Sequence, residues 1–188
     1  MKYSLNQLKS KIESGSCPDY ILFWGHTQKL PGITDNSSFS QWWPSPFTVD
    51  EITYPTAEHW MMAKKALLFG DAENFNLILK AHKPAIAKAL GRAVKNFDAA
   101  IWSSKAYELV VEGNQYKFSQ DESLKNYLLG TGNKVLVEAS PFDTVWGIGL
   151  SKNDEKAKDP FKWKGTNLLG FALMEVRDRI KKQEWKNN

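Results

Sequence analysis

Three side chains have the types and sequence positions that acid–base or nucleophilic chemistry requires, and a tryptophan accompanies them. The first is Glu58, in the opening turn of a predicted helix that starts after Thr56, where the helix dipole favours an anionic carboxylate. Such a carboxylate can stabilise a developing positive charge or orient a water molecule. The alternative is an ordinary first-turn glutamate that only stabilises the start of the helix.

A lysine follows Glu58 at a distance of two helical turns. Lys65 can therefore lie on the same face as Glu58, whereas Lys64 lies on a neighbouring face and is the alternative candidate. An amine in an apolar pocket has a lowered pKa and can attack an aldehyde-like carbon. A lysine at a helix edge, reaching solvent along its aliphatic stem, would give the same pattern.

A second carboxylate and a tryptophan complete the group. Asp143 lies between Pro141 and Gly147 in a predicted rigid loop, where a turn-capping aspartate is the alternative. Trp102 follows Asp98, a predicted N-cap, and would face inward as a core residue or as a ring packed over a sugar or base. Two separated carboxylates with aromatic walls match glycosidic cleavage through an oxocarbenium-like transition state, and they also occur in sites that only bind nucleosides.

Other catalytic patterns fail on spacing. The stretch 130–134 lacks the spacing of a phosphate loop and follows a predicted helix, and the glycines at 147–149 lack a third partner. The three histidines form no metal-ligand pair, so no metal site is expected, and no serine-hydrolase elbow is present. The sequence therefore argues against P-loop enzymes, Rossmann dehydrogenases, metalloproteases and serine hydrolases.

These candidate residues must be positioned by a mainly helical framework. Hydrophobic spacing predicts an α+β single domain with a few short strands, in which domain 20–184 follows an N-terminal extension, 1–19, containing a short helix. A loop is expected over 25–46. The predicted helices are 3–14, 57–69, 71–80, 83–90, 98–118, 121–130 and a last one whose apolar stripe runs over 169–180; the predicted strands are 20–24, 134–139 and a strand or hairpin within 47–54.

Composition is that of a soluble globular protein rich in aromatic rings. Of the 188 residues 42% are hydrophobic and 13% aromatic, which suits either a large core or a pocket that stacks flat ligands. The formal net charge of +4 is compatible with an anionic ligand. With the single cysteine Cys17, no apolar run that could span a membrane and no apolar signal segment, we expect a cytoplasmic protein without membrane contact.

Several sequence blocks, taken together, resemble the YbiA-like family, also called NADAR (NAD and ADP-ribose associated). They occur in the family's order from about 21 to 180 and cover most of the chain. The blocks are Phe39-Ser40-x-Trp42-Trp43-Pro44, Pro55-Thr56-Ala57-Glu58-His59-Trp60-Met61-Met62-Ala63-Lys64-Lys65-Ala66, Leu90-Gly91-Arg92, Leu136-Val137-Glu138, Asp143-x-x-Trp146-Gly147-x-Gly149 and Asn167-Leu168-Leu169-Gly170-x-x-Leu173-Met174.

The resemblance implies an N-glycosidase that cleaves the bond between ribose C1 and a base-like nitrogen and needs no cofactor. Its implied substrates are ADP-ribosylated guanine in nucleic acid or ribosylpyrimidine phosphates of riboflavin biosynthesis. The implied catalytic residues are Glu58, Trp102 and Asp143, with Lys65 as a candidate for capturing a ring-opened ribose. The implied ligand-binding residues are Phe23, Trp24, Gly25, Phe39, Ser40, Trp42, Trp43, Trp146, Gly147, Gly149, Asn167 and Gly170.

Two other functions fit the same residues, a non-catalytic binding module and a nucleic-acid-binding domain, the latter supported by the net charge of +4 and the aromatic rings. A non-catalytic module that binds ADP-ribose or NAD would keep the aromatic pocket without needing paired carboxylates. The expected partner is thus a small nucleotide or ADP-ribose-type ligand, or ADP-ribosylated nucleic acid. The basic stretch 152–164, which contains Trp163, could accept phosphates or a nucleic-acid strand, or could simply be a solvated loop.

Overall fold

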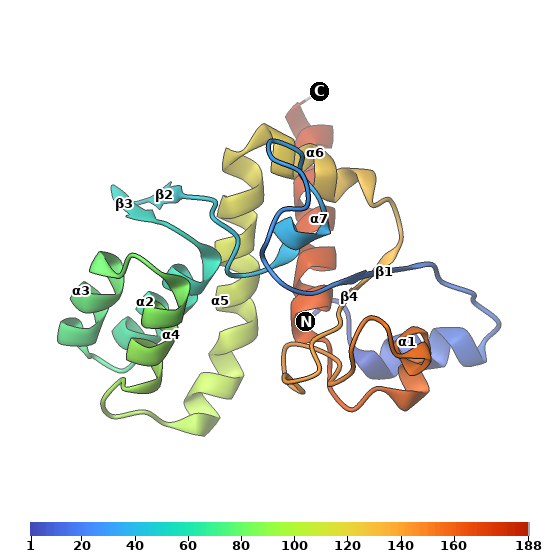
Figure 1. Ribbon diagram of the computed structural model, residues 1–188, viewed down its shortest axis with the longest axis horizontal. Coiled ribbons are helices and arrows are strands. Elements are labelled where there is room, and N and C mark those ends of the chain that lie inside the picture. The colour runs from blue at the N-terminus through green and yellow to red at the C-terminus, as the bar shows by residue number, and fades with distance from the viewer. Residues whose placement is uncertain (188) are drawn as a thin grey trace. The chain divides into compact units, whose positions relative to one another are not determined.

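The computed structural model describes residues 1–187 and consists mainly of helices with a few short strands (Figure 1). The expected α+β class is confirmed. The chain divides into two compact units. The first unit comprises Met1–Ser40 with Ser123–Asn188, and the second unit comprises Gln41–Glu122.

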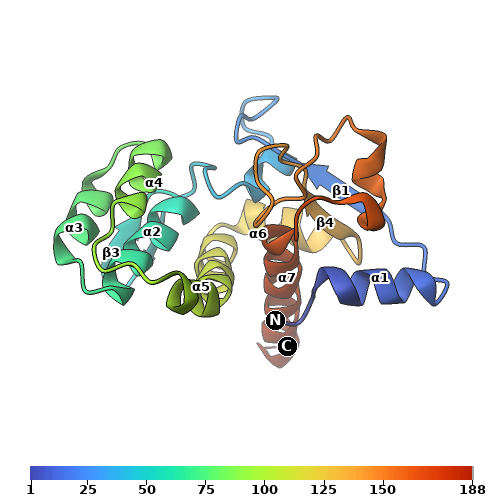
Figure 2. The same ribbon diagram turned by 90° about the horizontal axis from the view of Figure 1, so that it is seen from below.

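The first unit is built on two parallel strands from distant parts of the chain. Strand β1 (Tyr20–Phe23) pairs with β4 (Val135–Glu138), and Tyr20 lies opposite Val135. The long helix α7 (Leu168–Asn187) packs on β4 (Figure 2). Around this centre lie α1 (Leu5–Glu13), most of α6 (Glu122–Gly130) and three short 3-10 helices, η1 (Asn36–Phe39), η2 (Glu155–Lys158) and η3 (Pro160–Lys162).

The contact between α7 and β4 depends on a glycine. A Cβ atom at Gly170 would lie 2.0 Å from the carbonyl oxygen of Leu136, a distance that no side chain can occupy. Leu136 itself is fully buried. The helix therefore lies directly on the backbone of the strand.

The second unit surrounds one central helix. α2 (Ala57–Leu68) packs against α3 (Ala72–Lys80), α4 (Pro84–Arg92) and α5 (Ala99–Gln120), and Figure 1 shows these helices grouped together. Strands β2 (Phe47–Val49) and β3 (Ile52–Tyr54) form a hairpin. Its two turn residues, Asp50 and Glu51, both have positive φ angles, 48° and 65°, as a type I′ hairpin turn requires.

An aromatic cluster joins the hairpin to α2 and α5. Trp60 is 1% exposed, and its ring centroid lies 5.0 Å from that of Tyr54 and 5.5 Å from that of Tyr116. Its indole Nε1 donates a 2.8 Å hydrogen bond to the carbonyl oxygen of Leu109 in α5. At Gly113 a Cβ atom would lie 2.3 Å from the Trp60 ring, so the ring lies directly on the α5 backbone.

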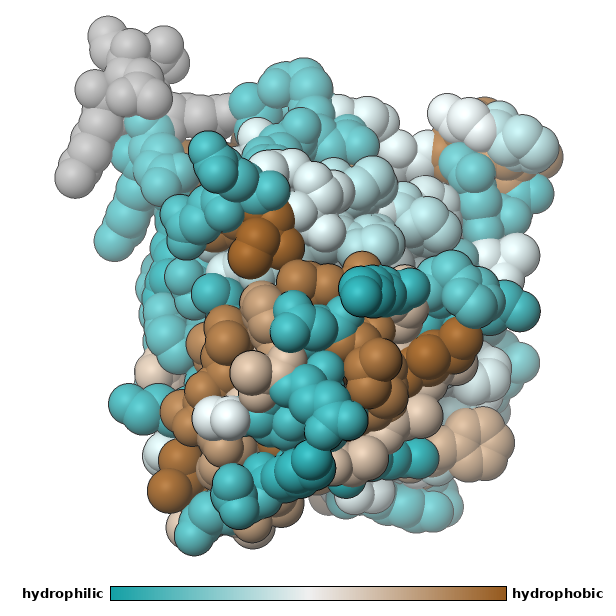
Figure 3. Space-filling view, turned by 90° about the vertical axis from the view of Figure 1, so that its left-hand side faces the viewer, coloured by the Kyte–Doolittle hydropathy of each residue, from teal (hydrophilic) through white to brown (hydrophobic). Residues whose placement is uncertain are grey.

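Apolar side chains also remain on the surface of the second unit. Figure 3 shows the α3–α4 side, where hydrophobic patches alternate with polar side chains. Leu77 of α3 and Ile86 of α4 are among the exposed hydrophobic residues, as are Phe97 and Ile101. In the described part of the chain, none of the helices has the length and apolarity needed to cross a membrane.

Three local expectations need correction. The strand predicted over 20–24, expected from its apolar residues to be buried, ends at Phe23, and Trp24 is 46% exposed. The loop predicted over 25–46 contains η1, because the Asp35 side chain accepts a hydrogen bond from the Ser37 amide at 2.8 Å and caps a helical turn. The inward-facing position predicted for Trp102 is only half-buried.

The basic stretch 152–164 is also more ordered than a solvated loop. It forms η2 and η3, and Trp163 is buried with its Nε1 donating to the carbonyl oxygen of Ala157 at 2.9 Å. The ring packs edge-on against Tyr20 at 6.4 Å. This indole is therefore a packing residue and is not free to stack on a base.

Candidate active site

The start of α2 is fixed by a buried hydrogen-bonded chain. The Thr56 hydroxyl caps the helix by accepting from the backbone amide of His59 at 3.4 Å, and it lies 2.8 Å from Nδ1 of the same histidine. Nε2 of His59 lies 2.9 Å from the carbonyl oxygen of Ala81. A carbonyl only accepts, so Nε2 carries the proton and Nδ1 accepts from Thr56. Burial lowers the pKa of His59, which favours this neutral form.

Glu58 lies within this fixed first turn and is 5% exposed. Its backbone amide donates a 2.9 Å hydrogen bond to the carbonyl oxygen of Gln41. The Gln41 side chain accepts from Nδ2 of Asn114 in α5 at 2.8 Å. In the part of the chain that the structure describes, Gln41 Nε2 and Asn114 Oδ1 are buried without a hydrogen-bond partner. Gln41, which pairs with the start of α2, and Asn114 of α5 thus each carry one buried polar atom whose hydrogen-bonding capacity is unused.

Lys65, two turns further along α2, is the buried member of the lysine pair. It is 9% exposed, and its Nζ donates a 2.8 Å hydrogen bond to the carbonyl oxygen of Gly91 in α4. Burial lowers the pKa of this amine, which increases the fraction of the nucleophilic neutral form. Lys64 is half-buried, and its Nζ lies 4.3 Å from the centre of the Trp60 ring.

Two aromatic rings face the Lys65 amine. Its Nζ lies 4.1 Å from the centre of the Phe97 ring and 5.5 Å from the centre of the Trp102 ring. The ring faces attract the charged amine, whereas the burial around it disfavours the charge, and burial is the effect that lowers the pKa of Lys65. The second unit therefore brings together Lys65 and Trp102, which are 37 positions apart in the sequence.

Other predicted ligand-binding residues of the second unit lie in the segment before the hairpin. Trp42 and Trp43 are both half-buried, and the Lys88 Nζ of α4 lies 5.7 Å from the centre of the Trp42 ring. A half-buried indole with a cation on it can pack against a flat or anionic ligand. Whether these tryptophans bind a ligand stays a prediction.

Two buried polar residues of α5 were not predicted. Asn114 and Lys117 are both fully buried, and burial lowers the pKa of Lys117 to about 7. Both occur at positions that helical spacing from Ala106 and Val110 assigns to the buried face. A polar side chain at a core position was the signal that could have identified them.

Asp143 belongs to the first unit, where its carboxylate is held by the loop that contains it. Oδ1 accepts hydrogen bonds from the backbone amides of Val145 and Trp146, both at 2.8 Å. Its carbonyl oxygen accepts from the Gly149 amide at 3.0 Å. Asp143 thus caps the turn through Oδ1, as the alternative interpretation of the sequence expected. These two bonds orient the carboxylate and do not involve Oδ2. Gly147 fits only as glycine, because a Cβ atom there would lie 2.9 Å from the carbonyl oxygen of Glu138.

Asn167, predicted to bind a ligand, holds the end of β4. It is fully buried with a φ of +56°; its Oδ1 accepts from the Glu138 amide and its Nδ2 donates to the Leu136 carbonyl, both at 2.9 Å. Both polar atoms of the side chain are therefore engaged with the strand. A ligand contact at Asn167 or at the neighbouring Gly170 stays a prediction.

The remaining predicted residues of the first unit divide between core and surface. Phe23 and Phe39 are buried and pack edge-on at 5.4 Å. Trp24 lies on the surface beside Phe142, with ring centroids 6.2 Å apart. Gly25 follows Trp24 and has a positive φ of 83°, and Ser40 is the C-cap residue of η1. Among the described residues no cluster of three or more histidine, cysteine, aspartate or glutamate side chains could hold a metal ion.

Comparison with known proteins identifies the family. The sequence matches the NADAR domain family over residues 22–181. It is 43% identical over 164 residues to an N-glycosidase of Acanthamoeba polyphaga mimivirus, an alignment that covers 85% of this chain and 95% of that relative. It is 32% identical over 146 residues to the N-glycosidase YbiA of Escherichia coli strain K12, covering 78% of this chain and 81% of that one.

A solved structure agrees with these matches. The NMR structure of the Escherichia coli protein YbiA superposes with a TM-score of 0.72 at 27% identity, covering 89% of this chain and 88% of that one. The fold and the relatives together define the class, an α+β hydrolase that acts on N-glycosyl bonds. Within that class, the chain belongs to the NADAR domain family.

Proposed function

We propose that this protein hydrolyses the bond between ribose C1 and a base-like nitrogen, with Glu58, Lys65, Trp102 and Asp143 as its catalytic residues. The observation that carries the proposal is the pair on α2: a buried carboxylate and, two turns on, a buried amine whose pKa is lowered and which lies beside a tryptophan ring. Buried ionisable groups with shifted pKa values are concentrated at functional sites, because burial is one way in which a site tunes its acids and bases. The N-glycosidase relatives support the bond class.

The chemistry follows from the charge that develops at C1. When the C–N bond breaks, its electron pair goes to the leaving nitrogen, which takes up a proton, and positive charge builds on the ribose. An anionic Glu58, placed at a helix start and shielded from water, stabilises that charge or orients the attacking water. Water then adds its oxygen to C1 and releases its proton, which balances the hydrolysis.

Lys65 offers a second route to the same products. Its neutral amine would attack C1 of the ring-opened sugar, form a C=N bond and expel the base as a neutral amine. One water molecule would then hydrolyse the imine, regenerate the lysine and release the sugar as an aldehyde. The hydrogen bond from Nζ to the Gly91 carbonyl fixes the position of the amine and leaves the nitrogen lone pair free in the neutral state.

Asp143 is proposed as the second carboxylate. Two backbone amides fix its Oδ1, so Oδ2 keeps a defined direction and can accept or donate a proton. A carboxylate held in a fixed direction can also stabilise the positive charge that develops at C1.

We further propose ADP-ribosylated guanine or a ribosylpyrimidine phosphate as the substrate. The half-buried Trp42 and Trp43 and the Lys88 amine near the Trp42 ring support a ligand with a flat base and a phosphate. A nucleotide-like small molecule satisfies both features. We propose the cytoplasm as the site of action.

Product analysis by mass spectrometry tests the function. The purified protein is incubated with DNA carrying ADP-ribosylated guanine and, separately, with a ribosylpyrimidine phosphate, beside Glu58→Gln, which keeps the size of the side chain but not its charge. Release of ADP-ribose or ribose 5-phosphate by the unmodified protein alone supports the proposal and identifies the substrate. If ADP-ribose binds tightly but neither substrate is cleaved, the protein is a binding module and the catalytic proposal is wrong.

A borohydride experiment separates the two routes. Sodium borohydride reduces an imine to a stable amine, so incubation with ADP-ribose should add the sugar mass to the protein if Lys65 forms the bond. The adduct should be absent from Lys65→Met and present in Lys64→Met, the adjacent half-buried lysine. Equal labelling of both variants would exclude Lys65 as the nucleophile.

A further inference from the structure

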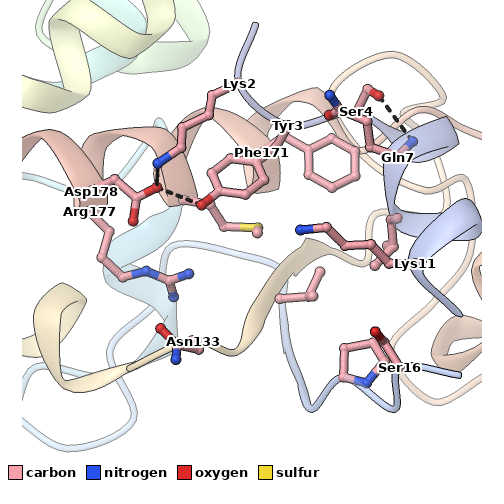
Figure 4. Close-up of a pocket in the computed structure, with 14 residues that line it drawn as sticks. Lys2, Tyr3, Ser4, Gln7, Lys11, Ser16, Asn133, Phe171, Arg177 and Asp178 are labelled. Carbon is pink, nitrogen blue, oxygen red and sulfur yellow. Dashed lines mark hydrogen bonds and ion pairs between the residues drawn. The ribbon is translucent and has the colours of Figure 1, made fainter. Parts of the chain in front are cut away.

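A cavity of about 460 Å³ lies within the first unit, between the N-terminal segment and α7. Figure 4 shows its walls: Tyr3, Gln7 and Lys11 come from the N-terminal segment and α1, Phe171 and Arg177 from α7. None of its lining residues belongs to the candidate active site described above. The α1 side lies outside residues 22–181, the part of the chain that matches the NADAR domain family.

Positive charge dominates the polar part of this cavity. Lys11 of α1 and Arg177 of α7 extend into it from opposite sides (Figure 4). The carboxylate in the wall, Asp178, is already paired: Lys2 Nζ and the Tyr3 hydroxyl both donate to its Oδ2, the latter at 2.5 Å. Asp178 also interacts electrostatically with Arg177, so the lining holds one carboxylate against three cationic side chains, Lys2, Lys11 and Arg177. This excess of positive charge favours an anionic ligand.

Arg177 has hydrogen-bonding capacity that the fold does not use. It is 3% exposed, and Nη1 donates to the Thr131 hydroxyl at 2.7 Å and to the Lys134 carbonyl at 3.0 Å. Its Nε has no hydrogen-bond partner among the described residues. A buried donor without an acceptor costs free energy, and an anionic oxygen would satisfy it. The two bonds from Nη1 hold the guanidinium in place, so a ligand would not have to order it.

The rest of the wall is apolar. Leu8, Phe171 and Met174 are all buried, and each lines the cavity. A volume of about 460 Å³ falls in the range of small-molecule sites, and an inorganic ion would leave most of it unfilled. The combination fits a molecule with one anionic end and one apolar body.

We propose that this cavity binds a small organic anion, whose carboxylate or phosphate lies between Lys11 and Arg177 and whose apolar body packs on Phe171, Met174 and Leu8. The planar guanidinium matches both kinds of anionic group. The site is a second ligand site, built jointly by α1 and α7. It does not depend on the catalytic proposal, because it shares no residue with it.

The test is a titration of the ¹⁵N-labelled full chain, followed by amide chemical shifts. The probes are phenyl phosphate, benzoate and inorganic phosphate, so that the phosphate and carboxylate sources are separated. We expect saturable shifts at lining residues of α1 and α7 with at least one of the two aromatic anions. Inorganic phosphate should bind more weakly, since it lacks the apolar body.

Variants of two exposed or half-buried lysines on α1 give the matched comparison. Lys11→Gln removes a cation that lines the cavity and should weaken the aromatic anion by about 10-fold, the loss of one charge-assisted hydrogen bond. Lys9→Gln removes the same charge from the same helix at a position that does not line the cavity, and should leave the affinity unchanged. Arg177 is not substituted, because its bonds to Thr131 and Lys134 support the fold.

Three results would overturn the proposal. The first is the absence of saturable shifts with either aromatic anion. The second is equal affinity in Lys11→Gln and the unmodified protein. The third is inorganic phosphate binding as tightly as phenyl phosphate, which would mean an adventitious ion only.

Discussion

Replacing Gly113 by alanine should destabilise the second unit, because the Trp60 ring occupies the space that a Cβ atom would need. The Cβ would lie 2.3 Å from Cδ1 of Trp60 and 2.7 Å from its Nε1. The ring is 1% exposed and packed against Tyr54 and Tyr116, so it cannot move aside without displacing them. This contact also sets the spacing of α2 and α5, the helices that carry Lys65 and Trp102.

The expected size of the effect follows from three contributions. Overpacking a buried site costs about 1–3 kcal/mol. Shifting the ring weakens its 2.8 Å hydrogen bond to the Leu109 carbonyl, worth about 1 kcal/mol. Alanine gains about 1 kcal/mol over glycine within a helix, which offsets part of the loss. The free energy of unfolding of Gly113→Ala should therefore fall by about 1–3 kcal/mol.

Urea unfolding measured by tryptophan fluorescence checks this value. The matched control is Gly130→Ala, at the end of α6, where no atom lies within 4 Å of the added Cβ. The control should keep or slightly raise the stability, since it gains helix propensity without a clash. If Gly113→Ala is as stable as the unmodified protein, the close approach of Trp60 to α5 does not constrain the fold and the reasoning is wrong.

Three further predictions concern single residues. Lys65→Met should reduce turnover at least about 100-fold, while Lys64→Met should stay active. Because the neutral amine reacts, the activity of the unmodified protein should rise with pH to a midpoint below 10.5, the usual pKa of lysine, and an activity that does not change at alkaline pH would exclude the amine. Burial lowers the pKa of folded His59 below the usual 6.5, so the unfolded state binds more protons as the pH is lowered through that value, and the free energy of unfolding should decrease. In paired urea titrations, His59→Gln should show a smaller decrease over the same pH range. In Asn167→Ala the free energy of unfolding should fall by about 2–3 kcal/mol, because two buried hydrogen bonds to β4 are lost. In Asn167→Gly it should fall less, because glycine tolerates the φ of +56°; the reverse order in thermal or urea unfolding would contradict this.

The starts and types of the helices could be predicted because their signals are local. Thr56 caps α2 by accepting from the His59 amide, and Asp98 caps α5 by accepting from the amides of Ala100 and Ile101. Each of these contacts spans two or three residues of sequence. The signal for the hairpin is equally local, because Asp50 and Glu51 separate two short segments, although the sequence left a single strand as the alternative.

Long-range features could not be predicted in the same way. The pairing of β1 with β4 joins residues more than 100 positions apart, and neither strand carries a sequence feature that selects the other. The cavity between α1 and α7 depends on how the chain termini pack, which no motif encodes. Asn167 was assigned to a ligand from its motif, whereas its polar atoms hold β4; sequence alone cannot separate a residue that binds a ligand from one that supports the loop around it.

The choice between the two adjacent lysines shows what structure adds to a motif. Consecutive helical residues are rotated by about 100°, so only one of them can share the buried face of α2 with Glu58. That residue is Lys65: its amine contacts the Gly91 carbonyl of α4 and lies beside the Trp102 ring, whereas Lys64 reaches over Trp60 and remains half-buried. The cost of burying an amine falls on Lys65 alone and lowers its pKa. The same burial that makes Lys65 unfavourable for stability is what makes it a candidate nucleophile, so the two variants Lys65→Met and Lys64→Met test packing and chemistry separately.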